Sequence, residues 1–197
     1  SKGDAVEEVK DDEVIAAGLI ASGISINEGV SQAIQENNNL DDDLQLLELA
    51  DKKRKKILAE YDKRGSKIRP LVLIQFPNGR EDWIKRVKEA LTDMGYPETS
   101  GLVASWFSGD HPDNPEQISN LDGQYAFLLF KQAIATGWDC PRAKILVKLR
   151  EGGTERFNIQ TVGRIRRMPE RKHYGLALLD NCYLYTLDNE FIEGMTT

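Results

Sequence analysis

The chain has 197 residues, of which 40% are hydrophobic, so its length allows one domain with an appendage or two small domains. No apolar run approaches the roughly 20 residues that a membrane helix needs, and the first residues lack the order of a signal peptide, so we expect a cytoplasmic protein with no membrane partner. Two cysteines, Cys140 and Cys182, and two histidines show no metal-ligand spacing, so we expect buried thiols and no metal site.

The net charge of −6 is distributed unevenly along the chain. Residues 1–65 hold 9 basic and 15 acidic side chains, whereas residues 66–197 hold 17 of each. Positions 140–172 carry 10 basic and 3 acidic side chains. The total argues against a generally basic nucleic-acid-binding surface, but the local excess of positive charge would attract an anion.

The first third of the chain is predicted to be a connector followed by a long helix. Residues 1–40 are acidic and then polar, with too few apolar residues for a core, and are interpreted as a connector. Over 41–64, apolar residues recur at helical spacing, aspartates begin the pattern and Gly65 follows it, which predicts a helix. The run KKRKK at 52–56 lies in this helix, and a solvated helix face is favoured there over a nucleic-acid or targeting patch.

Strands and helices alternate after Gly65. We predict an exposed, mobile polar loop over 108–123. Strands are predicted over 71–76, 102–107, 125–130, 144–149 and 176–179, a last strand or a hairpin over 182–187, and helices over 81–94 and 157–168. This alternation predicts an α/β fold with three layers, in which helices cover both faces of a mostly parallel sheet. Ligands of such folds usually bind at the carboxyl ends of the strands.

The segment 157–170, FNIQTVGRIRRMPE, is predicted to present arginines on one face of a helix that stops at Met168, before a proline. At 100° per residue, Gln160, Arg164 and Arg167 share one face, and aliphatic residues share the opposite face. Guanidinium groups in line with an amide suit the oxygens of a phosphate. A solvated basic face is the alternative interpretation.

A second polar segment, KQAIATGWDCPRA at 131–143, contains the sequence Gly137-Trp138-Asp139. A carboxylate at this position can accept hydrogen bonds from ribose hydroxyls, whereas Arg164 and Arg167 suit phosphates. Together the two segments indicate a nucleotide site. The alternative for Asp139 is a turn or helix-capping residue before Pro141.

Three segments resemble helicase motifs. QTVGRIRR (160–167) resembles motif VI of superfamily 2 helicases, KQAIATGWDCPRAKILV (131–147) resembles motif V, and RPLVLIQFPN (69–78) stands at the position of motif IV. In this order they resemble the second, C-terminal RecA-like motor domain of the type III restriction enzyme Res (R) subunit, over roughly residues 11–190. The resemblance implies a connector at 1–40, a helix packing on the motor domain at 41–65, and a RecA-like helicase domain at 66–197.

The resemblance implies an ATP site built from two motifs. Gln160, Arg164 and Arg167 match the motif VI residues that face the ATP phosphates, where the two arginines are catalytic because they stabilise charge as the γ-phosphoryl group leaves. Gly137 and Asp139 match the motif V pair at the same ATP site, and the carboxylate usually contacts the ribose or couples the two motifs.

It also implies a nucleic-acid-binding edge. Gln75, Pro77 and Asn78 match the motif IV turn, which commonly approaches a backbone phosphate. Lys131 stands where many helicases have a threonine that contacts the backbone. Lysine departs from that pattern, since it brings a charge in place of a hydroxyl.

Neither a GxxxxGK[ST] phosphate loop nor an acidic magnesium-binding motif occurs in this sequence. The resemblance therefore implies an ATP-dependent DNA helicase or translocase whose N-terminal RecA-like motor domain would hold Mg²⁺ and the rest of ATP, so this chain alone is expected to be inactive. For a restriction endonuclease subunit, it further implies a modification methyltransferase partner, although no PD…(D/E)xK nuclease signature appears. Two other interpretations stay open: a non-catalytic RecA-like module that binds nucleic acid or protein, and a glycosyltransferase-like nucleotide-binding half-domain.

Overall fold

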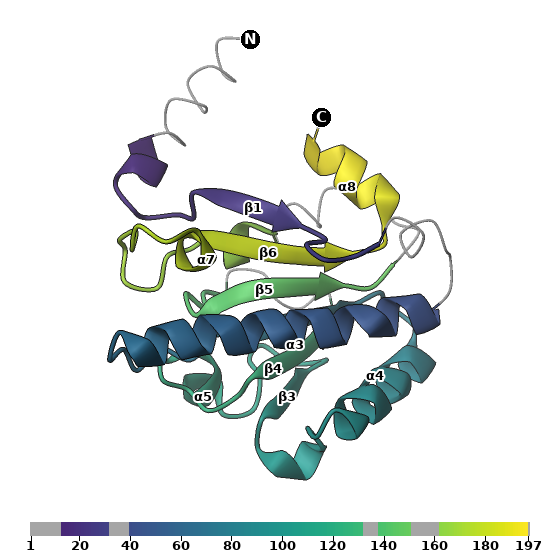
Figure 1. Ribbon diagram of the computed structural model, residues 1–197. Coiled ribbons are helices and arrows are strands. Elements are labelled where there is room, and N and C mark those ends of the chain that lie inside the picture. Colours follow the sequence, from purple (N-terminus) through teal and green to yellow (C-terminus); the bar gives the residue numbers. More distant parts are fainter. Residues whose placement is uncertain (1–12, 32–39, 132–137, 151–161, 197) are drawn as a thin grey trace.

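The computed structural model describes residues 13–31, 40–131, 138–150 and 162–196, and its centre is one six-stranded sheet (Figure 1). All neighbouring strands in this sheet are parallel. The strands are β1 (Gly23–Ile26), β2 (Leu71–Phe76), β3 (Val103–Trp106), β4 (Phe127–Lys131), β5 (Ala143–Lys148) and β6 (Asn181–Thr186). Their order across the sheet is β1-β6-β5-β2-β4-β3. The connection that leaves β2 runs toward the β3 edge of the sheet, and the connection that leaves β5 runs toward the β1 edge. Connections thus leave these two neighbouring strands in opposite directions.

Helices cover both faces of the sheet, which confirms the predicted three-layer α/β architecture. The helices are α3 (Leu40–Lys63), α4 (Glu81–Asp93), the 3-10 turn η1 (Glu98–Ser100), α5 (Pro115–Ser119), α7 (Ala177–Asp180) and α8 (Asn189–Thr196). The core on one face receives side chains from α3 and α4, and the core on the other receives them from α5, α8 and the helical turn at 162–165. Among the described helices, none is long and apolar enough to cross a membrane.

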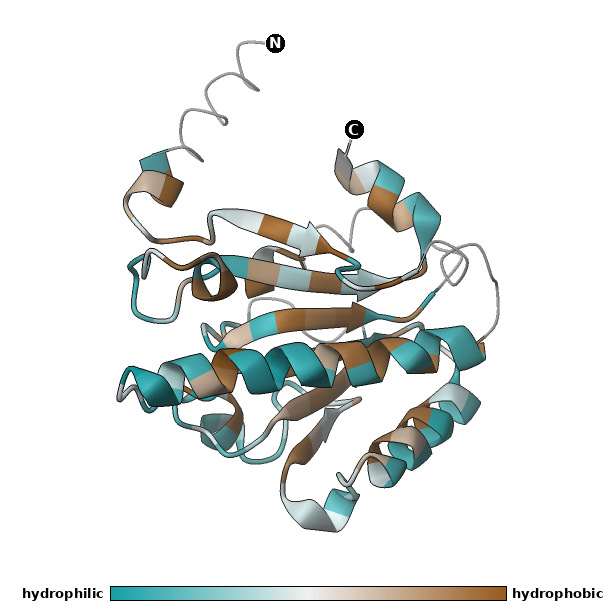
Figure 2. Cartoon of the chain, viewed as in Figure 1, coloured by the Kyte–Doolittle hydropathy of each residue, from teal (hydrophilic) through white to brown (hydrophobic). Residues whose placement is uncertain are grey.

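Alternate side chains of the central strands enter these two cores. In β2, Val72, Ile74 and Phe76 join the core under α3, whereas Leu71 and Leu73 join the core on the opposite face. Every residue of β2 and β5 is buried. Burial on both faces explains why such strands read as continuous apolar runs, and Figure 2 shows the hydrophobic colouring along β5 beside the largely hydrophilic outer side of α3.

The predicted helix over 41–64 is confirmed as α3. Three aspartates lie in its first turn and Lys63 lies in its last, an arrangement that the helix dipole favours. The prediction of a solvated face for the run 52–56 is wrong at Arg54, which is buried. Its guanidinium donates to Asp51 at 2.9 Å and to the Tyr96 hydroxyl at 3.1 Å, and these contacts attach α3 to the residues that follow α4.

Two elements differ from their predictions near the β1 edge. β1 lies inside the segment interpreted as a connector, yet it pairs with β6 along its whole length. Residues 176–179 are not a strand: 177–180 form α7, which directly precedes β6. The Asp180 carboxylate accepts hydrogen bonds from the backbone N–H groups of Tyr174 and Gly175, which holds this turn. A short apolar run suits either conformation, so its sequence pattern could not decide between them.

The predicted polar loop over 108–123 contains the short helix α5. Ile118 of α5 is fully buried in the core on the face of the sheet opposite α3. Gly123 permits this close packing, because a Cβ atom there would lie 2.1 Å from the carbonyl oxygen of Gln117. The loop therefore contributes to the core instead of lying wholly exposed.

Candidate functional site

Asp139, Arg164 and Arg167 come together on one side of the sheet. Arg167 Nη1 lies 3.3 Å from Asp139 Oδ1, although the two residues are 28 positions apart in the chain. Arg164 Nη1 donates a hydrogen bond of 2.8 Å to the backbone carbonyl of Trp138. The two polar segments singled out in the sequence therefore meet. Gln160 and Gly137, which were predicted to join this site, lie outside the described residues.

Arg164 and Arg167 reach the site from different backbone conformations. Residues 162–165 are helical, and Val162 and Ile165 are buried, as predicted for the back of this helix. The helix does not continue to Met168: Arg167 forms an antiparallel β-bridge with Ile20. Arg167 thus does not share a helix face with Arg164, and the predicted stripe is wrong for this residue.

The extended conformation around Arg167 has a clear cause in the backbone hydrogen bonds on either side of it. The backbone N–H of Ala21 donates to the Arg166 carbonyl at 2.6 Å, and the N–H of Met168 donates to the Leu19 carbonyl at 3.1 Å. These bonds hold the segment after the helix against residues 19–21. Gly18 permits the close approach of the two segments, since a Cβ atom there would lie 2.7 Å from the Cα of Lys172.

The two arginines differ in exposure. The Arg167 and Asp139 side chains are 46% and 56% exposed, so their ion pair is accessible to a ligand. Arg164 is half-buried, and burial lowers the pKa of its guanidinium while the nearby Asp139 carboxylate acts in the opposite direction. Arg164 still carries its charge at neutral pH, because an arginine is hard to deprotonate. The site therefore offers one anchored and one accessible cation.

This cluster lies at the amino-terminal edge of the sheet. Asp139 precedes β5, and Ile20, the bridge partner of Arg167, precedes β1. In a parallel sheet the starts of all strands share one edge, so the prediction of a site at the carboxyl ends is wrong for these residues. The reason is that a segment connecting two parallel strands must return to the starting edge, and Arg164 and Arg167 stand near the end of such a return.

The residues predicted to bind nucleic acid lie at the opposite, carboxyl-terminal edge. Parallel pairing of β2 with β4 brings Gln75 and Lys131 to this edge, and the turn after β2 carries Pro77 and Asn78. Asn78 is exposed, whereas Pro77 is buried. Lys131 is partly exposed and its Nζ lies 2.7 Å from the Glu81 carboxylate.

Gln75 is a correction to the predicted nucleic-acid contacts. Its side chain is only 1% exposed, so its amide cannot reach a nucleic-acid backbone in this structure. Its side chain lies on the same face of β2 as Leu71 and Leu73, which are in the core opposite α3, because the three residues are spaced two apart along the strand. Its Oε1 atom has no hydrogen-bond partner among the described residues.

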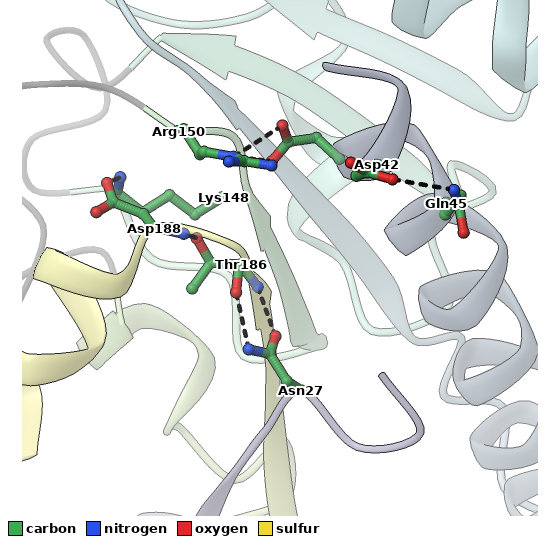
Figure 3. A network of polar contacts seen from close by, with 8 residues as sticks. Asn27, Asp42, Gln45, Lys148, Arg150, Thr186 and Asp188 are labelled. Atoms are coloured by element: carbon green, nitrogen blue, oxygen red, sulfur yellow. Dashed lines mark hydrogen bonds and ion pairs between the residues drawn. The ribbon is translucent and has the colours of Figure 1, made fainter. Parts of the chain in front are cut away.

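A buried polar network that the sequence pattern did not indicate lies at the same edge (Figure 3). Lys148 of β5 pairs with Asp188 at 2.9 Å, and Arg150 pairs with Asp43 of α3 at 3.2 Å. Burial raises the pKa of Asp43 to about 6 despite the attraction of Arg150. These pairs attach the start of α3 and the residue before α8 to the end of β5, which is a structural role. A short apolar run that contains two lysines gave no sign of them.

The described residues contain no group of three or more side chains suited to bind a metal ion. Cys140 and Cys182 are buried, as predicted, and burial raises the pKa of each thiol to about 11. Such thiols are poor nucleophiles at neutral pH and serve as packing groups.

Comparison of the sequence with known protein families and with curated proteins finds no match. We therefore infer the function from the residues of this chain and their geometry.

Proposed function

We propose that this chain is the second RecA-like motor domain of an ATP-dependent DNA helicase or translocase of the type III restriction enzyme Res subunit kind. The observation that supports this most directly is the convergence of Asp139, Arg164 and Arg167 on one surface. These residues come from the segments that resemble motifs V and VI, and a solvated basic face would not need them to meet.

The chemistry of the cluster suits the phosphate end of a nucleotide. An accessible guanidinium offers a fork of donors that matches two phosphate oxygens, and Arg167 has this exposure. In phosphoryl transfer such an arginine stabilises the charge that develops on the transferred group. Asp139 would exchange its ion pair with Arg167 for a nucleotide contact as the guanidinium turns to the phosphates.

The remaining parts of the ATP site would come from another domain. An N-terminal RecA-like domain of the same protein would supply the phosphate loop and the carboxylate that holds Mg²⁺, and ATP would lie between the two domains. The opposite edge of this domain, with Asn78 and Lys131, would contact the DNA backbone. A methyltransferase subunit that recognises the DNA sequence is the partner that this kind of enzyme implies.

Arg167→Ala in the protein that contains both motor domains tests the proposal. We expect DNA-stimulated ATP turnover to fall about 10³-fold, the scale of a lost arginine finger. Arg166→Ala is the matched control, because Arg166 is the neighbouring arginine and its described hydrogen bonds are made by its backbone N–H and carbonyl groups. Equal turnover in Arg167→Ala and wild type would refute the motor assignment and favour a non-catalytic interaction module.

A further inference from the structure

Two long cationic side chains are completely buried at the start of β5. Arg142 and Lys144 are both 0% exposed. In the described part of the chain neither makes an ion pair with a carboxylate. Their donors reach backbone carbonyls instead, and Lys144 also approaches one thioether sulfur.

Burial of these charges is costly for the fold. It lowers the pKa of the Lys144 ammonium to about 8 and that of the Arg142 guanidinium to about 10. Apolar residues of similar volume usually stabilise a core as well as buried ions do, or better. A contribution to packing alone therefore does not explain why β5 begins with two such residues.

Lys144 contacts the backbone that carries Arg167. Its Nζ lies 3.4 Å from the Arg167 carbonyl oxygen and 3.7 Å from the sulfur of Met168. The same short segment is bonded on its other side to Leu19 and Ala21. Lys144 and residues 19–21 thus both hold the extended segment that carries the Arg167 side chain.

Arg142 fixes the backbone near Arg164 through α5. Its Nε donates to the Ile118 carbonyl at 2.5 Å, its Nη2 to the Gln117 carbonyl at 3.1 Å, and its Nη1 to the Arg69 carbonyl at 2.8 Å. α5 is thereby attached to the starts of β2 and β5.

Trp138 connects α5 to the arginine. Its indole Nε1 donates to Ser119 Oγ at 3.2 Å, and its ring packs edge-on against Trp106 with centroids 5.8 Å apart. Its backbone carbonyl accepts the hydrogen bond from Arg164. The position of this carbonyl, and with it the direction of the Arg164 guanidinium, follows the position of α5.

We infer that Lys144 and Arg142 are positioning residues that place Arg167 and Arg164 for contact with the phosphates of ATP. Lys144 acts on the backbone of Arg167, and Arg142 acts on Arg164 through α5 and Trp138. The inference rests on the proposed function, because it assigns these contacts to the same ATP site.

The test measures DNA-stimulated ATP turnover in the protein that contains both motor domains. Lys144→Met keeps an unbranched side chain that is one heavy atom shorter and removes the ammonium donor, and Lys56→Met, at an exposed lysine of α3, is the control. We expect kcat to fall about 10-fold in Lys144→Met with KM for ATP nearly unchanged, since a displaced catalytic group affects the chemical step. The free energy of unfolding should equal or exceed that of wild type.

A double-mutant cycle separates positioning from a merely structural role. In an Arg167→Ala background, Lys144→Met should lower kcat no further, because its effect passes through Arg167. Wild-type kcat in Lys144→Met, or an independent loss in the double variant, would overturn the inference while the Arg167→Ala result still supports the motor assignment. Wild-type turnover in Arg167→Ala would overturn both.

Arg142→Lys provides a second variant that conserves the charge. A lysine cannot reach three carbonyls from this position in the way that the guanidinium does. We expect kcat to fall about 10-fold, with no further loss in an Arg164→Ala background. A loss that Arg164→Ala does not abolish would overturn the role assigned to Arg142.

Discussion

Lys144 gives the stability of this chain a pH dependence that one substitution isolates. Its ammonium is fully buried, and burial lowers its pKa from the usual 10.5 to about 8. Between these two values the unfolded chain keeps a proton that the folded chain has released, so the free energy of unfolding rises with pH in this window. From pH 7 to pH 9 this one group contributes a gain of about 1.3 kcal/mol, because only part of the window is crossed.

Urea unfolding of wild type and Lys144→Met at pH 7, 8 and 9 measures this contribution. Cys140 and Cys182 act in the opposite direction at the upper end, because burial raises their thiol pKa values from 9.0 to about 11. Asp180 also acts on the ammonium electrostatically. The two thiols are common to both proteins, so subtraction largely removes their own titrations.

The stability of Lys144→Met relative to wild type should therefore decrease by about 1.3 kcal/mol between pH 7 and pH 9. If the difference between the two proteins stays constant across this range, Lys144 is not a buried charge, and its burial gives no reason to assign it a positioning role toward Arg167.

Two further predictions concern the DNA edge and the packing of α5. Lys131→Ala in the protein with both motor domains should reduce the slope of log K for DNA against log salt by about one phosphate contact, with Lys56→Ala as control, and an unaltered slope would remove Lys131 from the DNA surface. Gly123→Ala should lower the free energy of unfolding by about 3 kcal/mol, because its Cβ atom would lie 2.1 Å from the Gln117 carbonyl oxygen. Gly163→Ala, where a Cβ atom meets nothing within 4 Å, is the matched control for urea unfolding, and equal stabilities of the two variants would contradict the close contact.

Much of the fold was predictable because its signals are local. The run at 71–76 forms a strand buried on both faces, and the spacing over 41–64 forms α3. In each case the side chains that decide the structure lie within a few residues of one another. One prediction failed where a short apolar run suits two conformations: residues 176–179 read as a strand, but 177–180 form α7. A distant segment decided the neighbour of β6, which is β1 from the predicted connector.

The candidate site shows the same division. The sequence by itself determined which side chains can bind phosphate, and its spacing placed Val162 and Ile165 on a buried helix face. Only the tertiary structure placed Arg167 on a β-bridge to Ile20 and brought its guanidinium to Asp139. It also buried Gln75 and placed Lys144 behind Arg167. The physical reason is that residue type and periodicity specify chemistry and local conformation, whereas burial and the edge of the sheet depend on contacts between segments far apart in the chain.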